Sequence, residues 1–322
     1  MALDRRLGLF LLLAPALARA DALFEYVRDV DTTPGADRIV LDTRPAAACV
    51  ERTLAGAHCL PAADLLGPHR RLPSFHDLLW VFGTVGLTGR ETVLVVGERA
   101  DARDFVAGLL FLAGQARVQV LAQPLRTLEG RATAPGRQRG NTRRAVFQAA
   151  LRDDLMVLTH ELAAQLEGAA PPPLLDGRGE AEYWGERVRG LRGGHLPGAR
   201  HLAASAVRAD LAAGRLPALA DTGRAVVYGH DAVESVAYLT LLRAGAGLDP
   251  RVYLDGFAAW AATTHLPLDS LTHPERAAPA AAPPPPAAAP APWLAVLAGA
   301  LAGALLVLVV FMLAARRRTP CN

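Results

Sequence analysis

The stretch RAVVYGHDAVESVAYLTLLR, residues 224–243, carries the pattern from which we predict the fold. Arg224–Tyr228 is a short apolar run typical of a strand buried on both faces, and Val233–Arg243 has the apolar period of a helix. A second copy lies upstream, where the apolar run Thr92–Val96 precedes the helical period of Phe105–Ala113. A strand that runs directly into a helix is the repeating unit of a parallel α/β sheet.

The rest of each half continues this layout. Strands and helices alternate along the chain, which predicts a parallel sheet with helices on both faces. An internal repeat longer than about a hundred residues indicates duplicated domains rather than a solenoid. We therefore expect an α/β fold with two domains, whose further strands are Arg38–Asp42, Val118–Leu121, Pro173–Asp176 and Arg251–Leu254.

The N-terminus has the features of a secretory signal. Arg5 and Arg6 precede the apolar run Leu7–Ala14, and a small-residue cleavage site ends at Ala20. The apolar run is shorter than the ~20 residues that span a bilayer. We predict a signal peptide at 1–20, although an uncleaved anchor or a buried first helix would suit the same residues.

The C-terminus predicts a transmembrane helix at 293–315. Leu294–Ala315 is free of charge and long enough to cross a bilayer, and Arg316–Arg318 follow it. By the positive-inside rule, residues 316–322 are a cytoplasmic tail. With the signal peptide, this predicts a single-pass protein of the bacterial inner membrane with its domains in the periplasm. Gly299 and Gly303 form a pair that suits helix–helix association, but Ala/Gly-rich segments also contain such pairs by chance.

Composition divides the chain further and limits its partners. The net charge is only +3 over 322 residues, so nothing in the overall charge suggests nucleic acid. Residues 130–144 are rich in Arg, Gly and Pro and lack apolar periodicity, which indicates a linker, whereas Ala and Pro dominate 274–292. We expect an N-terminal domain at 21–130, a linker at 131–150, a C-terminal domain at 151–270 and an extended stalk at 271–292.

Five short motifs follow one another through the second half. They are Leu175-Asp176-Gly177-Arg178, Glu182-Tyr183, Gly194-His195-Leu196-Pro197-Gly198-Ala199, Val226-Val227-Tyr228 and Tyr253-Leu254-Asp255-Gly256-Phe257-Ala258-Ala259-Trp260. In this order and spacing they resemble a rhodanese domain, the fold of thiosulfate sulfurtransferases. The first half is a fainter copy, with Leu41-Asp42-Thr43-Arg44 and Leu54-Ala55-Gly56-Ala57-His58. The resemblance covers about 22–265.

The resemblance implies chemistry through a cysteine persulfide. A thiolate attacks a sulfane-sulfur donor and passes the sulfur on, and converging backbone N–H groups lower the pKa of the thiol. The family's loop reads Cys-x-x-Gly-x-Arg before a helix. Here Gly229 stands at the cysteine position, Ala232 at the glycine position and Glu234 at the arginine position. The sequence thus predicts an inactive loop, formed by Gly229, His230, Asp231, Ala232, Val233, Glu234 and Ser235.

The first half offers no substitute, because Gly97 stands at its cysteine position. Of the three cysteines in the chain, Cys321 lies beyond the expected membrane helix. Cys49 and Cys59 form either a disulfide or two buried thiols, and a relocated nucleophile at Cys59 is a third alternative.

The histidines suggest two further kinds of site. His195, His201 and His230 invite a metal site, but no acidic or cysteine ligand accompanies His195 at metal spacing, so a structural role is favoured and no metal or cofactor is expected. His230 and Asp231 stand together at the loop mouth, where they would suit a base–carboxylate pair.

Two functions remain. The first is a non-catalytic rhodanese-like binding or scaffold module outside the cytoplasm, with an unknown protein partner. The second is a sulfurtransferase or sulfur carrier that uses Cys49, Cys59 or a partner's cysteine. A docking subunit of a membrane complex is a third hypothesis, drawn from the glycine pair and the stalk.

Overall fold

The first half of the chain forms a six-stranded parallel sheet in the computed structural model, which describes residues 23–30, 38–128, 133–215, 224–270, 305–309 and 312. The strand order is β1-β6-β5-β2-β4-β8. A separate pair, β3 and β7, is antiparallel. The elements are β1 (Leu23–Val27), β2 (Arg38–Asp42), α1 (Ala46–Glu51), β3 (Thr53–Leu54), β4 (His58–Cys59), α2 (Phe75–Thr84), β5 (Thr92–Val96), α3 (Ala100–Leu112), β6 (Arg117–Leu121), β7 (Thr133–Ala134) and β8 (Arg137–Gln138).

The second half forms a five-stranded parallel sheet in the order β11-β10-β12-β13-β9. Its parallel register confirms the α/β prediction from alternating strands and helices. The elements are β9 (Met156–Val157), α4 (Thr159–Glu167), β10 (Leu174–Asp176), α5 (Glu180–Tyr183), β11 (Arg200–His201), α6 (Ala204–Ala212), β12 (Val226–Tyr228), α7 (Ala232–Thr240), β13 (Arg251–Tyr253) and α8 (Gly256–Ala262).

Both sheets are covered on both faces, because alternate residues of each buried strand belong to different cores. In β12, Val227 packs in the core that contains α7, whereas Val226 and Tyr228 pack with Trp260 of α8. A continuous apolar run is therefore the expected sequence of such a strand.

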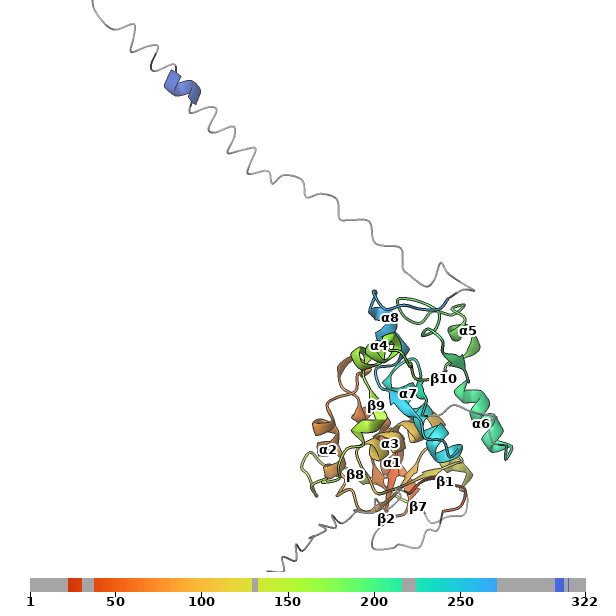
Figure 1. Ribbon diagram of the computed structural model, residues 1–322. Coiled ribbons are helices and arrows are strands. Elements are labelled where there is room, and N and C mark those ends of the chain that lie inside the picture. The colour runs from red at the N-terminus through yellow and green to blue at the C-terminus, as the bar shows by residue number, and fades with distance from the viewer. Residues whose placement is uncertain are drawn as a thin grey trace, which may run out of the picture. The chain divides into compact units, whose positions relative to one another are not determined.

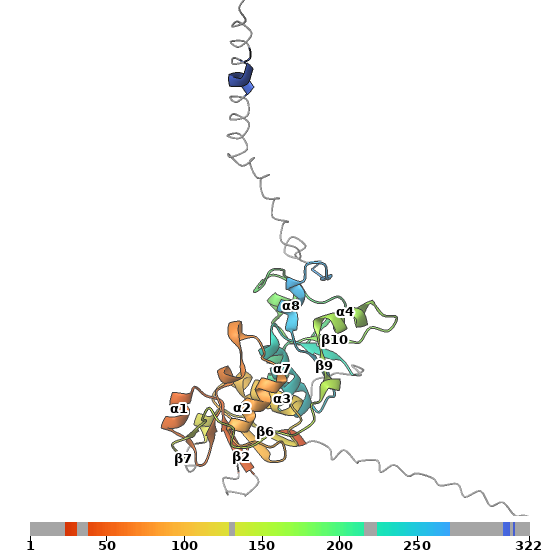
Figure 2. The ribbon, with the colours of Figure 1, turned by 90° about the vertical axis from the view of Figure 1, so that its left-hand side faces the viewer.

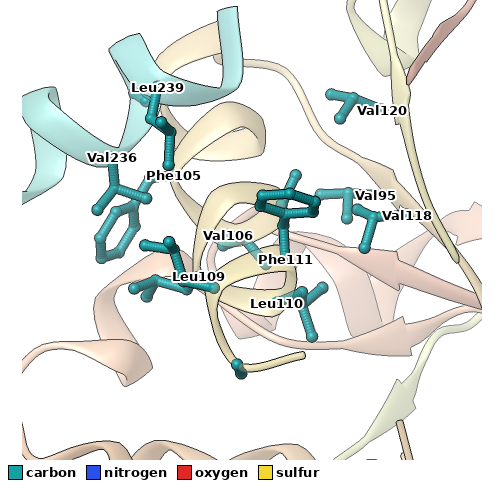
Figure 3. Close-up of a cluster of buried hydrophobic side chains, with 14 of the residues drawn as sticks. Val95, Phe105, Val106, Leu109, Leu110, Phe111, Val118, Val120, Val236 and Leu239 are labelled. Atoms are coloured by element: carbon teal, nitrogen blue, oxygen red, sulfur yellow. The ribbon is translucent and has the colours of Figure 1, made fainter. Parts of the chain in front are cut away.

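The two halves share one core, built where helix α3 lies against helix α7 (Figures 1 and 2). Phe105 of α3 points toward Val236 and Leu239 of α7, while Phe111 points toward Val95 of the first sheet (Figure 3). The approach is close at Gly108, where an added Cβ would lie 2.5 Å from Val236 Cγ1 and 2.6 Å from Thr240 Oγ1.

A buried carboxylate joins the halves beside this contact. Asp104 of α3 is fully buried and accepts hydrogen bonds from Tyr26 Oη at 2.7 Å and from Arg208 of α6 at 2.6 Å. Thr240 Oγ1 of α7 donates to the Asp104 carbonyl at 2.7 Å. Burial raises the pKa of Asp104 above its usual range, although Arg208 opposes the shift.

Residues 133–150, which lie within the predicted linker, contact the first half through strand pairs and an aromatic ring. Strand β8 pairs with β4, and β7 pairs with β3. Phe147 is buried and its ring lies 5.6 Å from that of Phe82. The Arg, Gly and Pro content does not predict these contacts, because strand pairing and one aromatic side chain can order a segment that has no apolar period.

The prediction of a transmembrane helix at 293–315 was wrong, and the fold class is corrected to the two α/β sheets alone. Within the part of the chain that the structure describes, no helix is long and apolar enough to cross a membrane. Of that span it describes only residue 312 and the helical stretch 305–309, which covers about 8 Å at ~1.5 Å per residue. The predicted signal peptide, the stalk, Gly299, Gly303 and Cys321 lie outside the described residues.

We expect Asp104→Ala to lower the free energy of unfolding by about 2–4 kcal/mol, because it leaves Arg208 and the Tyr26 hydroxyl without their shared acceptor. Asp104→Asn keeps an acceptor oxygen and removes a charge that burial disfavours, so its cost should be clearly smaller. Urea unfolding of the two variants measures the difference. Equal losses for both would contradict this role of the carboxylate.

Candidate functional site

A buried ion pair holds the residues that follow strand β10. Arg178 folds back on Asp176, with its NH2 group 2.5 Å from Oδ2, and both side chains are almost fully buried. The guanidinium carbon of Arg178 lies 3.6 Å from the centroid of the Phe257 ring. Asp42 and Arg44 repeat the pair in the first half, with a 2.7 Å contact. The two Asp-x-Arg motifs are therefore structural clamps at the carboxyl ends of their strands.

The loop between β12 and α7 uses its own side chains to satisfy its backbone N–H groups. Gly229 N donates to Ser235 Oγ at 3.0 Å, and His230 N donates to Glu234 Oε2 at 3.0 Å. Asp231 is the N-cap of α7, and its Oδ1 accepts from Glu234 N at 3.0 Å. An anion-binding loop needs such N–H groups free. Here internal acceptors occupy all three.

Position 229 also has no space for a side chain. A Cβ on Gly229 would lie 2.7 Å from the Glu234 carbonyl carbon and 2.8 Å from Ser235 N, and real Cβ atoms do not approach backbone atoms so closely. The loop has therefore closed over the place of the family's cysteine. Ala232 simply begins α7, where its Cβ causes no strain.

Glu234 is held by a cation from another part of the chain. Arg189 NH2 lies 2.7 Å from Glu234 Oε1, and Arg189 Nε lies 3.5 Å from Glu182 Oε1. Glu182 is buried, which raises the pKa of its carboxyl group. A glutamate thus stands where the family has an arginine, and Arg189 neutralises part of its charge.

His230 and Asp231 do not form the base–carboxylate pair that their adjacency suggested. The Asp231 carboxylate caps α7, and His230 Nδ1 is buried without a hydrogen-bond partner among the described residues. Burial lowers the pKa of His230 from 6.5, and the nearby Arg189 adds to the shift. The ring is therefore a neutral group at the loop mouth at pH 7.

The first-half loop is blocked as well. A Cβ on Gly97 would collide with Thr43 Oγ1. The Gly97 carbonyl accepts from the guanidinium of the buried Arg103 at 2.8 Å and from Leu125 N at 3.0 Å. This position too lacks both a nucleophile and the space for one.

The two cysteines of the first half are bonded to each other. Cys49 of α1 and Cys59 of β4 form a disulfide, and both are almost completely buried. Gly136 lies against it, because a Cβ there would come within 2.7 Å of Cys59 Sγ. Neither cysteine is a free thiol, so neither is available to carry sulfur in this state.

Two of the three histidines considered as metal ligands, His195 and His201, have protein partners. The His195 ring stacks on Tyr183 with 3.8 Å between centroids, and its Nδ1 lies 3.0 Å from the Tyr183 carbonyl. His201 Nε2 lies 2.9 Å from the Arg178 carbonyl oxygen. These contacts give both histidines structural roles.

Residues 158–263 match the family model of the rhodanese-like domain. The second half of the chain therefore contains a rhodanese-like domain, as the five motifs predicted. A comparison of the sequence with curated proteins finds no match.

Solved structures extend the likeness to both halves. The crystal structure of a probable thiosulfate sulfurtransferase is 26% identical, with a TM-score of 0.51 over 73% of this chain and 99% of that one. An anaerobic ergothioneine biosynthesis enzyme from Chlorobium limicola, solved with trimethyl histidine, is 17% identical, with a TM-score of 0.59 over 75% of this chain and 66% of the enzyme. YnjE is 16% identical, with a TM-score of 0.60 over 75% and 64%. The chain has the rhodanese-like sulfurtransferase-family fold, and the last two likenesses concern the fold alone.

Sequence reasoning missed Arg189 and the role of Ser235. Arg189 lies 45 residues before Glu234 along the chain, and no motif marks it. Ser235 was included in the loop, but its role as acceptor for Gly229 N depends on the turn geometry. A hydroxyl one turn into a helix is too common to signal such a role.

We expect Gly229→Ala to destabilise the chain by about 1–3 kcal/mol, because the added methyl group overpacks the loop against α7. Gly179→Ala is the matched control, since a Cβ there meets nothing within 4 Å. It should change stability by less than about 0.5 kcal/mol. If urea unfolding shows the same small change for both variants, the expected overpacking at position 229 is contradicted.

Proposed function

We propose that the chain is a tandem of two rhodanese-like halves that has lost sulfur transfer and acts as a binding module outside the cytoplasm. The observation that carries this is the loop 229–235, which has no cysteine and in which Ser235, Glu234 and Asp231 accept from the N–H groups of Gly229, His230 and Glu234. Persulfide chemistry needs a thiolate and free donors to stabilise it. The loop supplies no thiolate, and three of its donors are already occupied.

The disulfide argues against the sulfur-carrier alternative. A carrier must present a thiol to donor and acceptor in turn, whereas Cys49 and Cys59 are bonded and buried. A partner's cysteine would also meet a loop in which the N–H groups of Gly229, His230 and Glu234 are already occupied. Both observations favour binding over chemistry.

A purified fragment of residues 21–272 should show background thiosulfate:cyanide transfer and no persulfide by mass spectrometry. Gly229→Cys alone should remain inactive, because the new side chain has no room and Glu234 still occupies the His230 N–H group. The triple variant G229C/A232G/E234R restores the family's three loop residues together and is the informative comparison. Robust thiosulfate:cyanide transfer by the unmodified fragment would contradict the proposal.

The proposed location rests on the residues at the N-terminus and on the disulfide. Structural disulfides persist in oxidising compartments and are rare in the cytoplasm. A buried Cys49–Cys59 bond therefore suits a protein exported by the signal that residues 1–20 predict.

The location is tested by labelling thiols under denaturing conditions in cells that express the chain. We expect the full chain, which has three cysteines, to label once before reduction, at Cys321, and three times after it. A variant without residues 1–20 should label three times without reductant, because its disulfide is not formed. Full labelling of the complete chain before reduction would refute export.

A further inference from the structure

A cleft of about 920 Å³ lies between residues 69–75 of the first half and the loop 230–232 of the second. Helix α8 and the start of α4 complete its wall. Pockets for small organic ligands commonly measure ~300–1,000 Å³. The cleft is therefore large enough for a molecule of several rings or residues.

The floor of the cleft is apolar. Leu72, Phe75 and Met156 are partly buried there, and Leu254 is buried. Leu158 is 40% exposed on the same wall, which is high for a leucine. A ligand that covers this floor gains free energy from the apolar area that it removes from water.

Four carboxylates line the side that the second half contributes. In each, one oxygen accepts a backbone N–H group, and none has an ion-pair partner among the described residues. For Asp255 this group belongs to Thr159, whose hydroxyl donates to the same oxygen. Their remaining oxygens are available to a cationic group of a ligand. The four are Asp153, Glu161, Asp231 and Asp255.

Two arginines line the part of the cleft that the first half contributes. Arg70 and Arg71 are exposed and have no ion-pair partner in the described part of the chain. The turn that carries them is fixed, because Gly67 N donates to the Arg71 carbonyl at 2.8 Å and Arg71 N donates to the Pro68 carbonyl at 3.2 Å. Charges of both signs thus line the cleft together with its apolar floor.

The same turn has an unusual backbone. His69 and Arg70 have φ angles of 56° and 58°, in the left-handed region that residues other than glycine rarely enter. Such conformations are costly and cluster at ligand clamps. His230 Nδ1, at the loop mouth of the cleft, is buried without a partner among the described residues, so a polar group there is also unsatisfied.

We propose that this cleft binds a small amphipathic zwitterion, with its cationic end toward the four carboxylates, its apolar body on the Leu72 and Phe75 floor, and its carboxylate toward Arg70 and Arg71. The inference rests on the proposed function, since it assigns a ligand class to a site that binds without transferring sulfur. It differs from the family's chemistry because a thiosulfate-like anion has neither a cationic end nor an apolar body.

Calorimetry with the full chain and four forms of one dipeptide tests the charge requirement. The probes are Leu-Phe, its amide, its N-acetyl derivative and the N-acetyl amide, which are a zwitterion, a cation, an anion and a neutral molecule. We expect the zwitterion to bind about ten-fold more tightly than the cation and the anion, because each end adds a charge-assisted hydrogen bond. The neutral probe should bind most weakly, and added salt should reduce the differences.

Two variants assign the ends. Arg71→Gln should lower the affinity for the zwitterion to that for the amide and leave the amide unaffected. Glu161→Gln should weaken both, and its amide oxygen still accepts from Leu158 N, so helix α4 keeps its cap. Arg90→Gln and Glu167→Gln are matched controls, because both residues are exposed and neither lines the cleft.

Equal affinity for all four probes, no binding by any of them, or equal effects of the variants and their controls would overturn the ligand assignment. Sulfur transfer is assayed on the same samples. Turnover together with a zwitterion preference overturns only the proposed function, whereas a lack of preference without turnover overturns only the ligand.

Discussion

The packing of α3 against α7 is the contact on which the rest of the molecule depends. Each helix covers one sheet, so their contact joins two parallel sheets through one apolar core. It is close because Gly108 has no side chain opposite Val236 and Thr240. Since the loop 229–235 includes the first turn of α7, the packing that joins the halves also fixes where that loop lies.

The loop 229–235 belongs to a rhodanese-like domain and supplies acceptors for three of its own backbone N–H groups. The N–H groups at the start of a helix need acceptors whether or not a ligand is bound. Here Ser235, Glu234 and Asp231 supply acceptors from within the loop for the N–H groups of Gly229, His230 and Glu234. Glu234 therefore has the opposite charge to the arginine of the family's loop. Its carboxylate also accepts from the His230 N–H group, which could otherwise donate to a bound anion.

Arg189 offsets the negative charge of Glu234. Without it, Glu234 would stand near the buried Glu182 with no cation between them. The two contacts of Arg189 tie the segment after α5 to the first turn of α7. A cation that the family places on the helix is here brought by another segment, and its task is structural.

The sequence by itself determined the alternation of strands and helices, because apolar runs and helical periods are local. It also determined that glycines, Gly97 and Gly229, stand at the ends of their strands. It left open whether Cys49 and Cys59 are bonded and how 133–150 packs, because packing partners do not appear in the composition. Its prediction of a membrane helix was wrong.

Only the tertiary structure decided how the loop 229–235 is packed and which residue pairs with Glu234. The exclusion of a Cβ at position 229 depends on how closely the loop approaches α7, and the partner of Glu234 comes from a residue 45 positions away. The cleft between residues 69–75 and the loop 230–232 likewise exists only because α3 and α7 bring the two halves together. Distances of this kind are set by packing between segments, and no local pattern encodes them.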